Sequence, residues 1–431
     1  MIWNEKAECA SRADMRKLQS ERLKKMAALL WRNNPVYRRR FEHAGIAPAG
    51  IKDIRDIKRL PFTVKEDLRD NYPFGLFTDY KDTTEIHVSS GTTGNPTVVG
   101  YTKEDLKLWS EVMARSLALA GAEPGDMIQI AYGYGLFTGG LGFHYGALEM
   151  GLKVIPTSSG QTKRQLKLMT DFRPRILGCT PSYALFMLDE ARAMGMDPRT
   201  SSWEIGIFGA EPWSESMRKQ IEQSWDMLAT DVYGLSEIIG PGVSQECPHK
   251  CGLHLQWDVF YPEVIDPKTG EEVKEGERGE LVITTLTKRG IPLLRYRTRD
   301  IVTITYEKCR CGRTTPRISK ILGRTDDMLI IRGINVFPSQ IEYVLLKIEG
   351  TQPHYLLVVE RENNLDTLEV WVEVEEKMFS DEIKQLRALE EKIKREIENV
   401  LGIDVKVKLV EPKSIERSEG KAKRVIDKRK I

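Results

Sequence analysis

From residue 85 onward, short apolar runs alternate with longer amphipathic segments, and this alternation restricts the possible folds more than any other feature. The apolar runs predict strands at 85–88, 127–132, 152–155, 175–179, 204–208 and 228–233. The segments between them predict helices at 103–120, 142–150, 162–172, 181–194 and 214–224. Strand–helix–strand alternation with short apolar strands is typical of a parallel sheet that helices cover.

The pattern changes twice further along the chain. Residues 259–305 contain strands and turns, with the turn signal DPKTGEE at 266–272, and predict a β-rich subdomain. Past Gly323 a strand, a helix, two strands, a long charged helix and a last strand predict a small α+β unit. We therefore expect an α/β protein with a large domain, 1–325, of helix-covered sheets and a small C-terminal domain, 326–431.

Composition excludes several classes of protein. The 431 residues include 65 basic and 63 acidic side chains, so the net charge of +2 gives no global field for nucleic acid. The longest uncharged run, 127–148, contains six glycines and therefore predicts buried core rather than a membrane span. The first residues lack the apolar run of a signal peptide. We expect a cytosolic protein whose six cysteines are thiols or metal ligands.

The segment SSGTTGNPT at 89–97 is the strongest local signal. Its hydroxyls and glycines allow the backbone to fold tightly around a tetrahedral anion, which indicates a phosphate-binding loop. The segment is not a Walker A loop, because Asn95 and Pro96 follow Gly94 where lysine and serine or threonine are required. The alternative interpretation is a polar turn between two strands.

Further polar segments follow predicted strands, where the binding loops of α/β sheets lie. In DVYGLSE, Tyr233 offers a flat face for adenine, Ser236 a hydroxyl for phosphate and Glu237 an oxygen ligand for Mg²⁺. In RYRTRD, Asp300 is an acceptor suited to a ribose diol. In RSEGKAKR, Lys421 follows a glycine near the C-terminus, although this basic tail is also consistent with a solvated chain end.

Two short cysteine pairs form a second group of candidate site residues. Cys247 and Cys251 lie in CPHKCGLH, and Cys309 and Cys311 lie in CRCG. Such pairs on separate loops can close one tetrahedral metal site, and the adjacent histidines supply more donors than one site requires. The pairs are far in sequence from the phosphate motifs, so a structural metal is expected, with free thiols as the alternative.

These ordered segments resemble the adenylate-forming superfamily of acyl-CoA synthetases, and within it the phenylacetate–coenzyme A ligase family. The resemblance is carried by SSGTTG, GYGLFTGGLG, TPSYAL, GAEPWSE, YGLSE, TTLT, RYRTRD, CGRT, GR-DDMLIIRG-NVFPSQIE and EGKA-RVIDKR, from about residue 37 to the end. It implies ATP or AMP, coenzyme A and Mg²⁺ as ligands, a structural Zn²⁺, and a small domain that is mobile about a hinge at Asp326.

The resemblance also implies roles for individual residues. Lys421 is expected to be the adenylation lysine, with Glu237 near Mg²⁺, and Glu211, Asp231 and Tyr233 are expected to frame adenine. Ser236 is expected near the α-phosphate, and Asp300 with Arg324 at the ribose. Residues expected to hold the ATP phosphates are Ser89, Ser90, Gly91, Thr92, Thr93 and Gly94. Residues expected at the acid are Tyr132, Phe137, Gly209, Ala210 and Ile238. The expected zinc ligands are Cys247, His254, Cys309 and Cys311, with Cys251 as an alternative.

The sequence departs from the family pattern at two places. Asn95 stands where many relatives carry lysine in the phosphate loop, which removes one cation. After GLH the chain reads Leu255-Gln256-Trp257-Asp258-Val259, and only Asp258 matches the usual run.

The expected reaction is ligation of an aryl acid, phenylacetate first, to coenzyme A through an acyl-adenylate, with release of AMP and pyrophosphate. The alternatives are another acid, such as benzoate, indoleacetate or a deazaflavin-type coenzyme, and a non-catalytic nucleotide-binding relative. Small molecules are the expected partners, without nucleic acid or membrane, and the sequence leaves a homodimer open.

Overall fold

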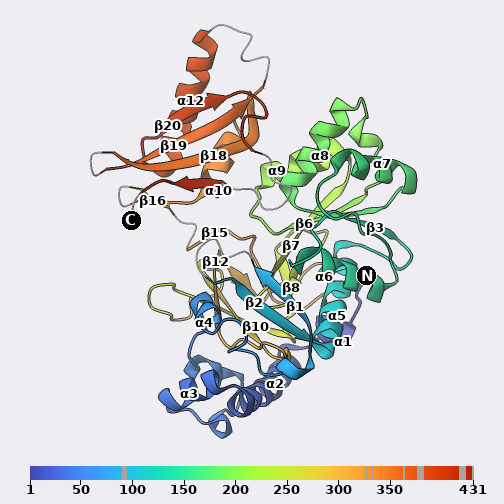
Figure 1. Cartoon of the computed structure of the whole chain (residues 1–431), viewed down its shortest axis with the longest axis vertical. Coiled ribbons are helices and arrows are strands. Elements are labelled where there is room, and N and C mark those ends of the chain that lie inside the picture. The colour runs from blue at the N-terminus through green and yellow to red at the C-terminus, as the bar shows by residue number, and fades with distance from the viewer. Residues whose placement is uncertain are drawn as a thin grey trace. The chain divides into compact units, whose positions relative to one another are not determined.

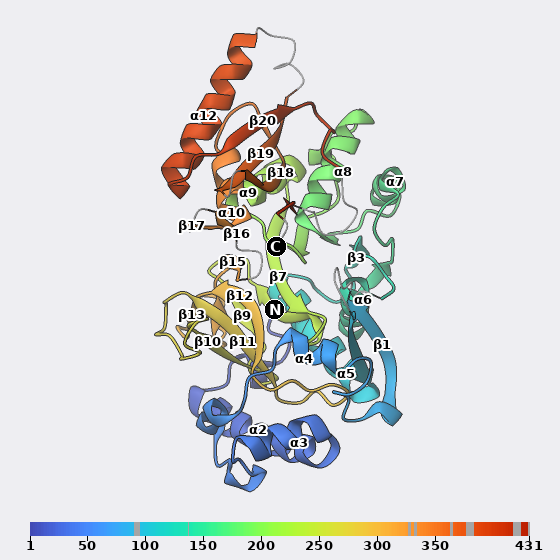
Figure 2. The same cartoon turned by 60° about the vertical axis from the view of Figure 1, so that its left-hand side comes forward.

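The computed structural model describes residues 1–89, 95–136, 138–325, 329–331, 334–362, 365–375, 383–416 and 424–429. The chain divides into two compact units, drawn in Figures 1 and 2. The first unit comprises Met1–Cys179, Thr200–Ala210 and Asp226–Lys320, and the second comprises Thr180–Arg199, Glu211–Trp225 and Ile321–Ile431. Among these described ranges, no helix is long and apolar enough to cross a membrane.

A large sheet of mixed direction forms the core of the first unit. Its strands follow the order β13-β14-β9-β8-β7-β6-β5-β3-β4. The part from β4 to β7 is parallel and the part from β7 to β13 is antiparallel. The predicted parallel sheet is therefore confirmed. The strands are β3 (Met127–Ile130), β4 (Lys153–Ile155), β5 (Ile176–Cys179), β6 (Ile205–Gly209), β7 (Leu228–Leu235), β8 (Gly240–Glu246), β9 (Leu253–Leu255), β13 (Ile304–Thr305) and β14 (Arg317–Ile318).

Two further antiparallel arrangements complete the strands of the first unit. β1 (Thr83–Ser89) and β2 (Thr97–Thr102) form a hairpin on either side of the predicted phosphate loop. β10 (Phe260–Ile265), β11 (Gly279–Thr285) and β12 (Tyr296–Val302) pair in sequence order, within the stretch predicted to be β-rich.

The N-terminal region is helical, and the structure divides it at Asn34. The side chain of Asn34 accepts hydrogen bonds from the backbone of Val36 and Tyr37, and Pro35 occupies the first position of the new helix. Proline is favoured there because that position needs no N–H donor. The helices of this unit are α1 (Glu5–Glu8), α2 (Arg12–Asn33), α3 (Pro35–His43), α4 (Lys65–Asp70), α5 (Lys103–Ala120), α6 (Thr138–Met150) and α7 (Thr162–Phe172).

Helices α5 and α6 lie side by side next to β8 (Figure 1). Thr102 and Asp105 form a capping box at the start of α5, and Gly121 ends it with a φ of 108°, a conformation that glycine adopts without strain. A Cβ atom at Gly146 of α6 would lie 2.3 Å from Cβ of Met113, so only glycine allows this approach. The close packing of these helices supports one side of the sheet.

The second unit contains a four-stranded sheet in the order β20-β19-β18-β21. β18 and β19 are antiparallel, and the outer strands run parallel to their neighbours. β21 lies in the basic tail, which was not predicted to form a strand. The elements are α8 (Pro181–Ala193), α9 (Glu215–Trp225), β15 (Gly323–Arg324), β16 (Leu329–Ile331), β17 (Ile334–Val336), α10 (Pro338–Leu345), β18 (Thr351–Glu362), β19 (Leu365–Val374), α12 (Ile383–Leu401), β20 (Lys406–Val410) and β21 (Val425–Asp427).

The contact between α5 and α6 gives a test of the fold. Gly146→Ala is expected to lower the free energy of unfolding by about 1–3 kcal/mol, because the added methyl overlaps Met113. Gly139→Ala in the same helix is the control, since its Cβ would lie 3.6 Å from Tyr132, an ordinary contact. Urea unfolding measures both. Equal stability of the two variants would contradict this account of the packing.

Candidate active site

A buried hydrogen bond joins two sheets of the first unit. The hydroxyl of Tyr233 on β7 donates to Oδ2 of Asp300 on β12, over 2.6 Å. Tyr233 is 8% exposed and Asp300 is 3% exposed. Two residues that the sequence analysis placed at adenine and at ribose are thus in direct contact, although β7 and β12 belong to different sheets.

The chain turns back sharply two residues after Tyr233, where β7 ends. The β7–β8 pairing shifts register between Tyr233 and Gly234. A Cβ at Gly234 would lie 1.8 Å from the carbonyl oxygen of Gly240, so a side chain cannot be accommodated there. The turn between β7 and β8 contains Ser236 and Glu237. The hydroxyls of Ser236 and Thr138 lie 3.1 Å apart, which ties the turn to the start of α6.

Glu237 is almost buried and lies between two lysines that sequence reasoning missed. Its Oε1 lies 3.3 Å from Nζ of Lys65 on α4. Its carbonyl oxygen accepts a hydrogen bond of 3.2 Å from Nζ of Lys288. Burial lowers the pKa of Lys288 to about 8, whereas the negative charges of Asp105 and Glu237 raise this pKa by a smaller amount. No local motif marks either lysine, because only the fold brings these distant segments to the turn.

The remaining predicted nucleotide residues are distributed as follows. Asp231 is buried on β7, and its backbone N–H donates to Glu246 over 3.1 Å. Glu211 and Arg324 belong to the second unit, where Oε1 of Glu211 accepts a hydrogen bond of 2.8 Å from the backbone of Ser182 in α8. Ser89 ends β1 and pairs with Thr97 of β2, so these strands hold the ends of the phosphate loop. Predicted residues outside the described ranges are Ser90, Gly91, Thr92, Thr93, Gly94, Phe137, Asp326 and Lys421.

The described residues predicted at the acid lie at the ends of strands β3, β6 and β7. Tyr132 is buried and stacks on Phe143, with ring centroids 4.9 Å apart. Gly209 cannot carry a side chain, because a Cβ there would lie 2.2 Å from the carbonyl oxygen of Val232. Ala210 has a φ of 69°, a strained conformation for a residue with a side chain. Ile238 is fully buried.

The two cysteine pairs lie close to one histidine. Donor atoms lie within 4.8 Å of one another in the set Cys247, His254, Cys309 and Cys311. The distance between the sulfurs of Cys247 and Cys309 is 3.8 Å, and that from Cys311 Sγ to His254 Nε2 is 3.6 Å. A tetrahedral zinc with ordinary bond lengths requires donor separations of about 3.5–3.8 Å, so the four side chains fit such a metal. Cys251 is exposed and is not one of the four, although its sulfur lies 3.3 Å from Cys309.

The contacts around this cluster also suit metal binding. Nδ1 of His254 lies 2.8 Å from the hydroxyl of Thr315, which leaves Nε2 facing the sulfurs. Such an outer partner orients the imidazole of a metal-bound histidine. The pKa of the Cys311 thiol is lowered, first by its hydrogen bond with Cys247 and then by His254. A thiolate is the form of cysteine that binds metal.

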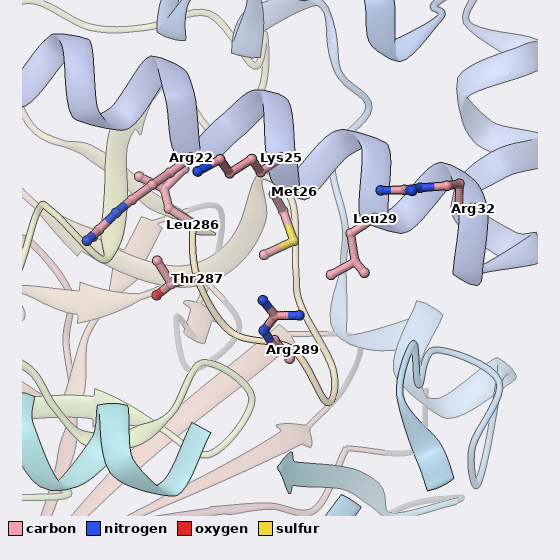
Figure 3. Close-up of a pocket in the computed structure, with 8 residues that line it drawn as sticks. All are labelled: Arg22, Lys25, Met26, Leu29, Arg32, Leu286, Thr287 and Arg289. Atoms are coloured by element: carbon pink, nitrogen blue, oxygen red, sulfur yellow. The ribbon is translucent and has the colours of Figure 1, made fainter. Parts of the chain in front are cut away.

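A separate pocket of about 390 Å³ lies between α2 and the loop that follows β11 (Figure 3). The side chain of Arg289 points into it, together with basic and apolar side chains from α2. The residues that line it are Arg22, Lys25, Met26, Leu29, Arg32, Leu286, Thr287 and Arg289. None of the predicted site residues lines this pocket.

Comparison with known proteins gives the family of the chain. Residues 65–287 match the family described as AMP-binding enzyme, and residues 333–429 match the AMP-binding enzyme C-terminal domain. A protein of Thermus thermophilus named phenylacetate-coenzyme A ligase is 52% identical over the whole length of both chains. A protein of the same name from Escherichia coli is 47% identical and covers 100% of this chain and 99% of its own. The chain belongs to the phenylacetate-coenzyme A ligase family.

Solved structures extend this family assignment to the fold. A 2-hydroxyisobutyryl-CoA ligase in a postadenylation state is 30% identical, with a TM-score of 0.93 over 99% of this chain and 92% of its own. The same ligase has also been solved in a thioesterification state with CoA, and there the TM-score is 0.73 over the same shares of the two chains. The chain therefore has the adenylate-forming ligase fold, and these solved structures of the similar ligase contain an acyl-adenylate and, in one state, CoA.

Proposed function

We propose that this protein ligates an aryl carboxylic acid, with phenylacetate as the first candidate, to coenzyme A and forms AMP and pyrophosphate. The observation that carries the proposal is the buried contact of Tyr233 with Asp300 beside the Ser236–Glu237 turn, in a chain similar over its full length to phenylacetate-coenzyme A ligases. A cytosolic location and a homodimer stay predictions.

The proposed ATP site rests on the resemblance, and the geometry of the first unit supports part of it. Adenine would lie against Tyr233, Asp231 and Glu211. The ribose hydroxyls would bind to Asp300 and Arg324, and the phosphates would bind to residues 89–94. The contact between Tyr233 and Asp300 supports this assignment, because one hydrogen bond fixes the groups for base and sugar together. Lys65 supplies a cation 3.3 Å from the carboxylate of Glu237.

Glu237 fits a Mg²⁺ ligand. Its carboxylate is almost buried, and the ammonium group of Lys65 lies 3.3 Å from it. Mg²⁺ usually binds one or two protein carboxylates together with substrate phosphates, so a single glutamate suffices. When bound, the ion would neutralise charge on the phosphates. The protein's own part is to hold Glu237, with Ser236 near the α-phosphate.

The chemistry requires no protein nucleophile. A carboxylate oxygen of the acid attacks the α-phosphorus of ATP, the bond to the β-phosphate oxygen breaks, and pyrophosphate leaves. Lys421 would stabilise the negative charge that develops in this transition state. The coenzyme A thiolate then attacks the acyl carbon and AMP leaves. A hinge at Asp326, at the proposed boundary between domains 1–325 and 326–431, would remove Lys421 for this step.

The acid would lie among Tyr132, Phe137, Gly209, Ala210 and Ile238. The stacked rings of Tyr132 and Phe143 support an aryl substrate, since an aromatic wall favours a flat apolar ligand. The four clustered side chains of Cys247, His254, Cys309 and Cys311 would hold a structural Zn²⁺, a proposal that their donor separations support.

Pyrophosphate release tests the choice of acid and the enzyme itself. With ATP, Mg²⁺ and a panel of acids, phenylacetate is expected to exceed acetate in kcat/KM by at least roughly 30-fold, because burial of the ring is worth about 2 kcal/mol. Benzoate and indoleacetate belong in the same panel. Equal efficiency with acetate would contradict the aryl pocket, and no release with any acid would favour a non-catalytic protein.

The two half-reactions test Lys421. Lys421→Ala is expected to lose acid-dependent pyrophosphate release by several orders of magnitude, because its charge is needed only where negative charge develops. The same variant, given preformed phenylacetyl-adenylate and coenzyme A, should form thioester at the wild-type rate. Lys413→Ala, an exposed lysine, is the control. Equal loss in both half-reactions by a folded variant would refute the proposed alternation of domains.

Elemental analysis tests the metal. Protein never exposed to a chelator should carry about one zinc per chain. Cys309→Ser is expected to lose zinc and to lower the melting temperature, because the binding energy of a structural metal contributes to folding. Cys251→Ser, which alters the nearby cysteine outside the set of four, should keep its zinc. Metal-free wild-type protein would refute the site.

A further inference from the structure

A fully buried lysine lies next to the active-site turn. Lys288 has no exposed surface, and it follows β11 in the sequence Thr287-Lys288-Arg289. Burial of an ammonium group costs free energy unless the group is paired and hydrogen-bonded. Its Nζ donates to the carbonyl oxygen of Glu237 over 3.2 Å and lies 4.7 Å above the ring of Tyr101.

Tyr101 holds the adjacent carbonyl of the same turn. Its hydroxyl donates to the carbonyl oxygen of Ser236 over 3.3 Å. Its ring stacks on Trp109, with centroids 5.0 Å apart and an interplanar angle of 13°, so the ring has little freedom to move. Tyr101 and Lys288 therefore hold two consecutive carbonyl groups of the turn from the same side.

Asp105 fixes the backbone that carries this lysine. Its Oδ1 accepts from the backbone N–H of Arg289 over 2.7 Å, and its Oδ2 accepts from Gly290 over 2.8 Å. The same Oδ2 accepts from Thr102 of β2 over 3.0 Å. One carboxylate thus joins the loop of Lys288 to the strand of Tyr101, and it also supplies a negative charge near the buried ammonium.

We propose that Lys288 is a positioning residue for the adenylation step, which fixes the main chain of Glu237 so that its carboxylate meets the magnesium–ATP complex. This inference rests on the proposed function, because it assumes that Glu237 serves Mg²⁺. It adds a set of residues, Lys288, Tyr101 and Asp105, outside the predicted site. The set acts on the turn through hydrogen bonds to its main chain.

The loop of Lys288 offers a matched control. The side chain of Arg289 points into the pocket beside α2 (Figure 3), whereas Lys288 reaches Glu237. Arg289→Met and Lys288→Met each remove one cation from adjacent positions and add the same side chain. Only Lys288→Met removes the hydrogen bond to Glu237.

The test measures pyrophosphate release against Mg²⁺ concentration in the full-length protein. Lys288→Met is expected to raise the Mg²⁺ concentration for half-maximal rate by about tenfold, as expected when an outer partner of a metal ligand is lost. Lys288→Arg, which keeps a donor and a charge, should recover part of this loss. Thioester formation from preformed phenylacetyl-adenylate should keep the wild-type rate, because that step does not use the magnesium–ATP complex. Arg289→Met should match the wild type throughout.

The outcomes separate this inference from the proposed function. If wild-type protein releases no pyrophosphate with any acid, the proposed function fails. If the wild type is active and folded Lys288→Met has the Mg²⁺ dependence of Arg289→Met, the positioning role is refuted. A purely structural role is indicated if Lys288→Met lowers the melting temperature and slows both half-reactions equally. If Lys288→Met does not fold, Tyr101→Phe tests the positioning role instead. This variant keeps the stacked ring and removes the hydrogen bond to the carbonyl of Ser236. It should shift the Mg²⁺ dependence in the same direction as expected for Lys288→Met.

Discussion

The change of strand direction at β7 determines where the chemistry of this protein lies. β7 pairs in parallel with β6 on one side and antiparallel with β8 on the other, so the chain must reverse within a few residues. Glycine at 234 makes the reversal possible, because any side chain there would overlap the carbonyl of Gly240. The reversal leaves Ser236 and Glu237 at the edge of the sheet, where the parallel strands end. The hydrogen bond of Tyr233 to Asp300 then links that edge to the β-rich sheet.

Around this reversal, short polar contacts replace the apolar packing that stabilises the rest of the first unit. Glu237 interacts with Lys65 through its carboxylate and with Lys288 through its carbonyl. Buried polar groups of this kind are costly when any partner is missing, and they restrict the chain to one arrangement when all partners are present. The turn therefore combines a main chain that is held at two consecutive carbonyls with a carboxylate that Lys65 pairs.

The sequence was informative where the signal was local. Periodicity predicted the parallel strands and their helices, and the order of motifs predicted Tyr233, Ser236, Glu237 and Asp300. It was not informative where function depends on contacts between distant segments. Lys65, Tyr101, Asp105 and Lys288 carry no motif, and their relation to Glu237 exists only after the strands pair. The strand Val425–Asp427 was missed for the same reason, since it is defined by its pairing with β18 and not by its composition. The cysteine pairs, in contrast, were recognisable because their spacing is local.

The residues that follow Cys311 also hold the beginning of the chain. Arg313, two residues after Cys311, donates from Nη2 to the carbonyl oxygen of Met1 over 2.6 Å and forms a buried ion pair with Glu8. Thr314 adds hydrogen bonds to the same N-terminal segment. These hydrogen bonds connect the first residues of the chain to the loop that carries Cys309 and Cys311. A truncation of the first ten residues would therefore remove hydrogen-bond partners of Arg313 and Thr314, next to the loop that carries Cys309 and Cys311.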